Sequence, residues 1–157
     1  MKPKILFLCT ANACRSQMAE ALLRHLAGHR FEAFSAGAAP AGFVHPLAHE
    51  AMDRLHVPMD GQTSKSWDDF DNVPLDAVIT LCDSAAKQPC PTGLRAPIMG
   101  HWSTPDPASH LGDEEDRIAF AVLVANRLRS KLEALIRLDW SAPRETIAAN
   151  VRALGEI

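Results

Sequence analysis

The feature that most constrains this chain is a short apolar run near its start that ends at a cysteine. Residues 5–8 (Ile-Leu-Phe-Leu) have the composition of a buried strand, and Cys9 follows directly. Residues 16–26 carry apolar side chains at helical spacing, and Gly28 follows as a stop signal. The sequence therefore predicts a strand, a tight turn and a helix, with Cys9 at the turn.

Five residues separate Cys9 from Arg15, and this segment is an expected cradle for an oxyanion. Backbone N–H groups at the start of a helix lack internal partners, and the helix dipole adds positive charge there. The guanidinium of Arg15 can hold two oxygens of a tetrahedral anion. The expected oxyanion-binding residues are Thr10, Ala11, Asn12, Ala13, Cys14 and Arg15.

The same cradle favours the thiolate form of Cys9, because a helix N-terminus and a nearby cation stabilise negative charge on sulfur. We therefore expect Cys9 to be a nucleophile at neutral pH. The alternative is a buried, inert cysteine beside a solvated arginine. That alternative leaves the ordered strand, loop and helix unexplained.

Strand-like and helical segments alternate along the chain, which is typical of an α/β domain with a parallel sheet. We predict a single domain over residues 1–139, built as a four-stranded parallel sheet flanked by helices, and a short C-terminal helical extension over residues 140–157. The expected strands are 5–8, 31–36, 77–81 and 96–99, and the expected helices are 16–26, 46–55, one from about 113, and 143–154. The helix from 113 is expected to bury Ile118, Ala121, Ala125, Leu128, Leu132 and Leu135.

Two further cysteines gain meaning from this topology. The carboxyl ends of parallel strands meet at one edge of the sheet, and Cys9 and Cys82 each follow a predicted strand there. The loop from Cys82 to Cys90 is long enough to fold back on itself. Thiol–disulfide exchange could then carry oxidation from Cys9 to Cys82 and on to Cys90. The alternative is a pair of unrelated buried cysteines.

A single carboxylate, Asp106, stands between Pro105 and Pro107 after the fourth predicted strand. Proline rigidity would aim this side chain. Negative charge in the cradle keeps a nearby carboxylic acid protonated, so Asp106 could donate a proton to a leaving oxygen as a general acid. Aspartate beside proline is also common in simple turns, which is the alternative.

Composition argues against several other classes of protein. The formal net charge is −3 with both signs interspersed, and we find no basic stripe, so we expect no nucleic-acid partner. The early apolar run is too short for a membrane span or a signal sequence, so we expect no membrane contact and a cytoplasmic location. Four cysteines in such a chain favour catalysis or metal binding over structural disulfides.

A metal-binding or metal-sensing protein is a further candidate, because His45 and His49 would share a helix face. A histidine pair at this spacing, without a Cys-x2-Cys pair or a third ligand nearby, is more often a solvated helix face. We therefore expect no metal site.

Several motifs, in their order along the chain, resemble the low-molecular-weight protein tyrosine phosphatase family, and more closely its arsenate reductase branch. The resemblance covers roughly residues 3–138. It rests on residues 9–20 (Cys-Thr-Ala-Asn-Ala-Cys-Arg-Ser-Gln-Met-Ala-Glu), Ser35-Ala36-Gly37, Thr80-Leu81-Cys82, Cys90-Pro91, His101-Trp102 and Asp106-Pro107.

The resemblance implies that Cys9 attacks arsenate, that Arg15 and the loop amides bind its oxygens, and that Asp106 is the general acid for loss of hydroxide. Cys82 would then attack the Cys9–arsenic adduct, release arsenite and leave a Cys9–Cys82 disulfide. Cys90 would convert this bond to a Cys82–Cys90 disulfide. The resemblance implies no bound cofactor but an external thiol reductant, either thioredoxin or glutathione with glutaredoxin. Phosphate and sulfate would compete with arsenate.

The resemblance also implies supporting roles. Asn12 would brace the anion loop, and Ser16 would hydrogen-bond the nucleophilic thiolate. Some reductases of this branch bind potassium near the loop through an Asn, a Glu, a Ser and an Asp. Asn12, Glu20 and Ser35 match the first three. Lys65 takes the place of the Asp, so its ammonium could replace the cation, and we expect no potassium dependence.

The phosphatase branch is the nearest rival, since the same cradle and acid hydrolyse phosphate monoesters through a cysteinyl phosphate. Tyrosine phosphatases of this family usually follow Asp-Pro with aromatic residues that grip the substrate ring. Here Ala108 and Ser109 follow, and the chain contains no tyrosine. Those phosphatases also lack counterparts of Cys82 and Cys90, so the sequence favours the reductase.

Overall fold

The computed structural model describes residues 2–83, 94 and 96–157. Its strands, helices and 3-10 helices (η), in chain order, are β1 (Lys4–Cys9), α1 (Arg15–Ala27), β2 (Glu32–Gly37), α2 (Pro46–Arg54), η1 (Trp67–Phe70), β3 (Ala77–Thr80), β4 (Ile98–His101), η2 (Pro107–Ser109), α4 (Glu114–Ile136) and α5 (Arg144–Leu154).

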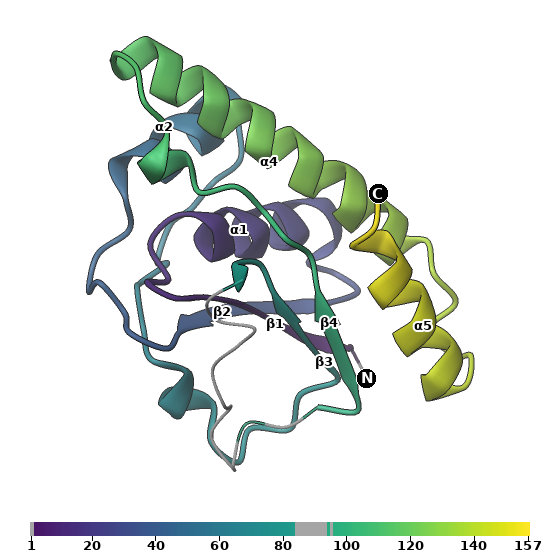
Figure 1. Ribbon diagram of the computed structural model, residues 1–157. Coiled ribbons are helices and arrows are strands. Elements are labelled where there is room, and N and C mark those ends of the chain that lie inside the picture. Colours follow the sequence, from purple (N-terminus) through teal and green to yellow (C-terminus); the bar gives the residue numbers. More distant parts are fainter. Residues whose placement is uncertain (1, 84–93, 95) are drawn as a thin grey trace.

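The four strands form one parallel sheet in the order β2-β1-β3-β4 (Figure 1). β1 lies between two partners, so Leu8 is opposite Ala36 on one side and Thr80 on the other. Residues 5–8 of this central strand have no exposed surface. The predicted α/β fold with a four-stranded parallel sheet is therefore confirmed.

The two faces of the sheet are covered differently (Figure 1). Side chains alternate along a strand, so Ile5 and Phe7 point to one face, where they join a core with α1, α2, α4 and α5. Leu6 and Leu8 point to the other face, where η1 contributes its aromatic side chains. The strand that carries Cys9 is thus held between two apolar layers.

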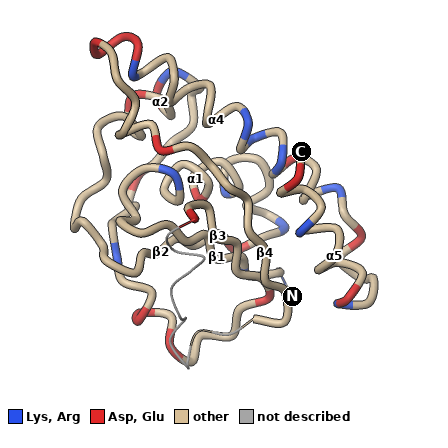
Figure 2. The backbone as a smooth tube through the Cα atoms, viewed as in Figure 1, with Lys and Arg blue, Asp and Glu red and all other residues tan. Residues whose placement is uncertain are grey.

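Charge is distributed unevenly along α4, the longest helix. Acidic residues gather at its N-terminal end and basic residues along its C-terminal half (Figure 2). Asp113 caps the helix by accepting a 2.8 Å hydrogen bond from the Asp116 amide, and acidic groups here favour the helix dipole. As predicted, α4 buries Ile118, Ala121, Ala125, Leu128, Leu132 and Leu135. Neither α4 nor any other helix within the described ranges is long and apolar enough to cross a membrane.

The fourth strand begins later than the expected 96–99. Pro97 has no amide hydrogen to donate to a neighbouring strand, and pairing with β3 starts at Ile98, opposite Ala77. The strand ends at His101, and Trp102 is the first residue of the loop that leads to Asp106.

The helical extension at the C-terminus packs on the edge strand β4. Trp102 is fully buried, and its indole Nε1 donates a 2.9 Å hydrogen bond to the Val151 carbonyl in α5. Gly155, just after α5, lies so close to β4 that a Cβ there would be 2.4 Å from the His101 carbonyl oxygen. α5 therefore shares the core of the sheet, while the boundary expected between residues 139 and 140 stays a prediction.

We predict that Trp102→Phe lowers the free energy of unfolding by about 2 kcal/mol, because it removes a buried hydrogen bond and leaves a small cavity. The matched control is Trp140→Phe, which loses a similar bond to the Leu135 carbonyl at a half-buried site and should cost about half as much. Urea unfolding measures both. Equal losses would show that α5 is not anchored through Trp102.

Candidate active site

The loop between β1 and α1 turns its carbonyl groups outward. Segment 39–45 runs beside it and supplies amide donors to those carbonyls at 2.8–2.9 Å. The pairs are Ala39 to Thr10, Ala41 to Ala11 and His45 to Ala13. Within the described part of the chain, the amides of residues 11–14 donate no hydrogen bond. These amides are therefore the donors available to an anion at the start of α1.

Asn12 holds this loop in a conformation that few residues adopt. It is fully buried with φ of 47°, in the left-handed region. The Lys65 backbone amide donates to its Oδ1 at 2.9 Å, and Gln17 Nε2 also donates to that oxygen. Because a backbone amide can only donate, this contact identifies the oxygen of the Asn12 amide and leaves Nδ2 facing Ser16.

That orientation decides what the Ser16 hydroxyl does. Asn12 Nδ2 donates to Ser16 Oγ at 2.8 Å, and Ser16 Oγ lies 2.9 Å from Cys9 Sγ. With Asn12 donating to it, the hydroxyl can direct its single hydrogen at the sulfur. The chain of hydrogen bonds from Lys65 through Asn12 to Ser16 thus ends at the sulfur of Cys9.

Gly37, at the end of β2, lets the cradle pack closely on the sheet. A Cβ at this position would lie 2.5 Å from the Thr10 carbonyl oxygen and 2.9 Å from the Asn12 nitrogen. Any side chain would push the loop out of place. The third residue of the Ser35-Ala36-Gly37 motif is therefore glycine for a steric reason.

Arg15 and Asp106 meet beside the cradle. Arg15 Nη1 donates to the Thr104 carbonyl at 3.0 Å, and Arg15 Nη2 lies 3.8 Å from Asp106 Oδ2. Asp106 also caps η2, since its carboxylate accepts bonds from the Ala108 amide at 3.0 Å and the Ser109 hydroxyl at 3.3 Å. Asp106 thus both caps a turn and lies beside Arg15, so the two alternatives that the sequence left open for it are compatible.

Cys9 and Cys82 are in contact at the carboxyl edge of the sheet, where they form a buried cluster of their own. The Thr10 hydroxyl lies 3.3 Å from Cys82 Sγ. The structure therefore brings together the first two thiols of the expected sequence. Cys90 lies outside the described residues.

Cys14 is a buried neutral thiol beside these groups. Burial raises its pKa to about 12, the negative charges of Asp106 and Cys9 raise it as well, and Arg15 opposes the shift. Its side chain packs in the core that α1 shares with the sheet. Cys14 thus faces the anion site with its backbone amide rather than with a reactive sulfur.

The residues that match a potassium site are paired with each other and with Lys65. Lys65 Nζ donates to the carbonyls of Thr63 at 2.8 Å and Ser35 at 3.3 Å. The Ser35 hydroxyl donates to Glu20 at 2.6 Å, and Glu20 also pairs with Arg24. An ammonium already binds the carbonyl oxygens here, so the donor set does not fit potassium.

His45 caps α2 rather than sharing a helix face with His49, which corrects the sequence interpretation. Its Nδ1 accepts a 3.0 Å bond from the Leu47 amide, and α2 begins at Pro46. The placement of His45 directly before a helix-starting proline is a signal the sequence offered. The described residues contain no group of three or more side chains that could hold a metal ion.

His45 and Arg117 also surround the acid loop, and sequence reasoning missed both. Burial lowers the pKa of His45 below its usual value, the Arg117 guanidinium lowers it further, and Asp106 opposes both. Arg117 Nη2 donates to the Ala108 carbonyl at 3.1 Å and so holds η2 in place. Only the fold brings α4 to this loop, so no local motif could have indicated Arg117.

Comparison with known proteins places these residues in context. The family model of low molecular weight phosphotyrosine protein phosphatase matches residues 4–139. The arsenate reductase of Bacillus subtilis (strain 168) is 37% identical over 134 residues, which cover 85% of this chain and 95% of that protein. A solved arsenate reductase in the intermediate state aligns with a TM-score of 0.69 and 30% identity over 87% of this chain and 97% of its own. A thioredoxin-dependent arsenate reductase from Corynebacterium glutamicum aligns with a TM-score of 0.57 and 30% identity over 84% of this chain and 62% of its own.

We predict that iodoacetamide at about pH 8 alkylates Cys9 at least tenfold faster than Cys14. A thiol with a pKa of about 12 is ionised in about one molecule in ten thousand at that pH, and the thiolate is the reactive form. Peptide mass spectrometry over time measures both rates, and the same reaction in urea, where the two cysteines should react alike, is the control. Comparable rates in the folded protein would contradict the neutral state of Cys14.

Proposed function

The chain belongs to the low molecular weight phosphotyrosine protein phosphatase family, and we propose that it is an arsenate reductase that works through a cysteine nucleophile and an intramolecular disulfide relay. The contact between the thiols of Cys9 and Cys82 carries this proposal. Hydrolysis of a phosphate ester needs one cysteine in the cradle. Reduction of arsenate needs two electrons, and a second sulfur beside the first supplies them as a disulfide forms.

In the first step, arsenate enters the cradle and its oxygens accept hydrogen bonds from the loop amides and Arg15. The Cys9 thiolate attacks arsenic, and a sulfur–arsenic bond forms as one arsenic–oxygen bond breaks. Asp106 donates a proton to the departing oxygen, which leaves as water. The 3.8 Å separation of Arg15 Nη2 and Asp106 Oδ2 supports this role, because the acid lies beside the group that holds the substrate.

In the second step, the Cys82 thiolate attacks the sulfur of Cys9. A sulfur–sulfur bond forms, the sulfur–arsenic bond breaks, and its electron pair stays with arsenic, which leaves as arsenite. The Thr10 hydroxyl, 3.3 Å from Cys82 Sγ, can donate a hydrogen bond that orients this thiolate. Cys9, which attacks arsenate, and Cys82, which releases arsenite, are thus adjacent.

In the third step, the Cys90 thiolate attacks Cys82, forms the Cys82–Cys90 disulfide and releases Cys9 as a thiolate. An external thiol then reduces that disulfide. One relative, the arsenate reductase of Corynebacterium glutamicum, is thioredoxin-dependent. Thioredoxin or glutathione with glutaredoxin is the proposed reductant here, in a reducing compartment such as the cytoplasm.

We predict the following result when the reduced protein meets arsenate in a single turnover. Wild type releases about one arsenite per chain and forms a Cys82–Cys90 disulfide, because each turnover consumes one pair of thiols. Cys90→Ser releases arsenite but stops at a Cys9–Cys82 disulfide. Cys82→Ser retains Cys9 bound to arsenic and releases almost none. Arsenite detection and mass spectrometry of the disulfides measure these outcomes.

The same experiment separates the reductase from a phosphatase. Hydrolysis of an aryl phosphate is measured in parallel for wild type, Cys82→Ser and Cys90→Ser. If all three hydrolyse the ester equally and none produces arsenite, the relay is wrong and the chain is a phosphatase.

We further propose that Lys65 is a built-in cation that supports the anion loop. Its backbone amide holds Asn12, and its ammonium binds two carbonyl oxygens beside the cradle. Two charge-assisted hydrogen bonds and a fixed positive charge would favour an oxyanion in the loop.

We predict that Lys65→Met raises the KM for arsenate about tenfold, since a loop that loses its bracing charge binds the anion less well. Lys2→Met is the matched control, because Lys2 Nζ also donates to a carbonyl, that of Gly28, but Lys2 precedes the start of β1 and the cradle follows its end. Wild-type rates should be equal in potassium and sodium chloride. Potassium activation of the wild type, or an unchanged KM in Lys65→Met, would remove Lys65 from this role.

A further inference from the structure

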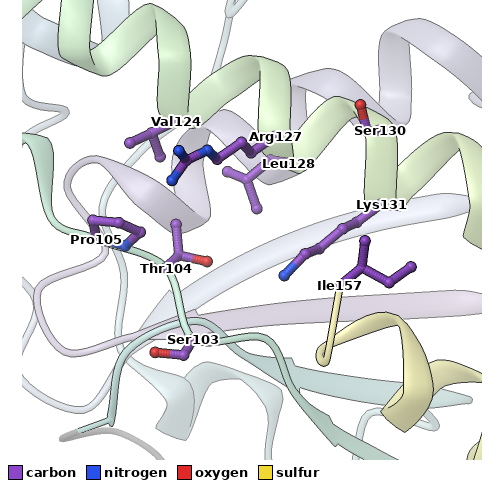
Figure 3. Close-up of a pocket in the computed structure, with 9 residues that line it drawn as sticks. All are labelled: Ser103, Thr104, Pro105, Val124, Arg127, Leu128, Ser130, Lys131 and Ile157. Atoms are coloured by element: carbon purple, nitrogen blue, oxygen red, sulfur yellow. The ribbon is translucent and has the colours of Figure 1, made fainter.

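A pocket of about 590 Å³ opens between α4 and residues 103–105, and its lining residues include no cysteine. Val124 and Leu128 of α4 form its apolar wall. Across from the helix, Pro105 lies at one end of the pocket and Ile157 at the other (Figure 3). Cavities of this volume with a largely apolar lining are typical of small-molecule sites. An inorganic oxyanion would leave most of that apolar surface unused.

Two cations extend into the same pocket. Arg127 and Lys131 are four residues apart on α4, and Figure 3 shows both side chains pointing from the helix toward residues 103–105 and Ile157. In the described part of the chain, no carboxylate lies within 4.0 Å of either one. Burial and the neighbouring Arg127 lower the pKa of Lys131 below its usual value. The pocket thus combines an apolar wall with two cationic side chains that, in the described residues, take part in no salt bridge.

The pocket is separate from the proposed reaction, although it adjoins the same loop. It contains none of the groups assigned to the relay, while Thr104 lines the pocket and accepts a hydrogen bond from Arg15 through its carbonyl. The family model matches residues 4–139, and Ile157 lies beyond that range. The wall that Ile157 contributes is therefore not part of the family-matched region.

We propose that this pocket binds a small organic anion, with a carboxylate held by Arg127 and Lys131 and an apolar body against Val124, Leu128 and Ile157. Arginine can take both oxygens of a carboxylate, and lysine adds a point charge beside it. Burial of the apolar body supplies affinity that a surface ion pair lacks. The ligand class is an aliphatic or aromatic monocarboxylate.

Calorimetric titration of the full chain with octanoate tests the proposal, with 1-octanol as the uncharged counterpart. Saturating inorganic phosphate is present throughout, so the cradle is occupied and cannot take the carboxylate. Octanoate should bind saturably and at least about tenfold tighter than octanol. The double variant Arg127→Gln/Lys131→Gln should lose about tenfold in octanoate affinity. Arg129→Gln is the matched control, since Arg129 lies on the same helix but faces Glu133 and does not line the pocket.

A second variant keeps the test independent of the two cations. Ile157→Asp places a negative charge at an exposed position on the opposite wall, so it should weaken octanoate binding without affecting the fold. Equal affinity for octanoate and octanol, or unchanged binding in the double variant or in Ile157→Asp, would overturn the proposal. Because binding is measured without arsenate, its failure is distinguishable from a failure of the reductase proposal.

Discussion

The left-handed backbone of Asn12 is the constraint on which the rest of the site depends. A residue at φ of 47° reverses the direction of the peptide groups around it. Here the carbonyls of Thr10, Ala11 and Ala13 face segment 39–45, while the amides of residues 11–14 remain available at the start of α1. Such a conformation persists only where neighbours stabilise it. Asn12 has those neighbours in Ser16, Gln17 and the Lys65 amide, and Gly37 leaves room for the loop. The strained turn and the anion site are one feature.

Electrostatics then separate the cysteines by function. Cys9 receives a hydrogen bond from Ser16, in the first turn of α1, so its sulfur lies at a helix N-terminus, where negative charge is favoured. Cys14, five residues later, is buried among negative groups and keeps its proton. Cys82 contacts Cys9 and the Thr10 hydroxyl. The same residue type thus supports three different behaviours in one small region, because each sulfur has different neighbours.

Local patterns were sufficient for most of the fold and for the centre of the site. The apolar run before Cys9, the spacing to Arg15 and the buried stripe of α4 predicted the strand, the turn and the longest helix where the structure has them. The sequence places the fourth strand two residues too early, because apolar residues near prolines do not reveal where pairing starts. The spacing of His45 and His49 indicates a shared helix face, but the position of His45 before Pro46 makes it a cap.

By itself the sequence determined the α/β class, the cradle from Cys9 to Arg15 and the order of the candidate thiols, because these follow from short-range periodicity and from chemistry within a few residues. The tertiary structure alone decided the contact of Cys9 with Cys82, the pairing of Arg15 with Asp106, the approach of Arg117 to the acid loop and the pocket beneath Ile157. These contacts join residues separated by many positions. Their geometry depends on sheet order and helix packing, which no local pattern encodes.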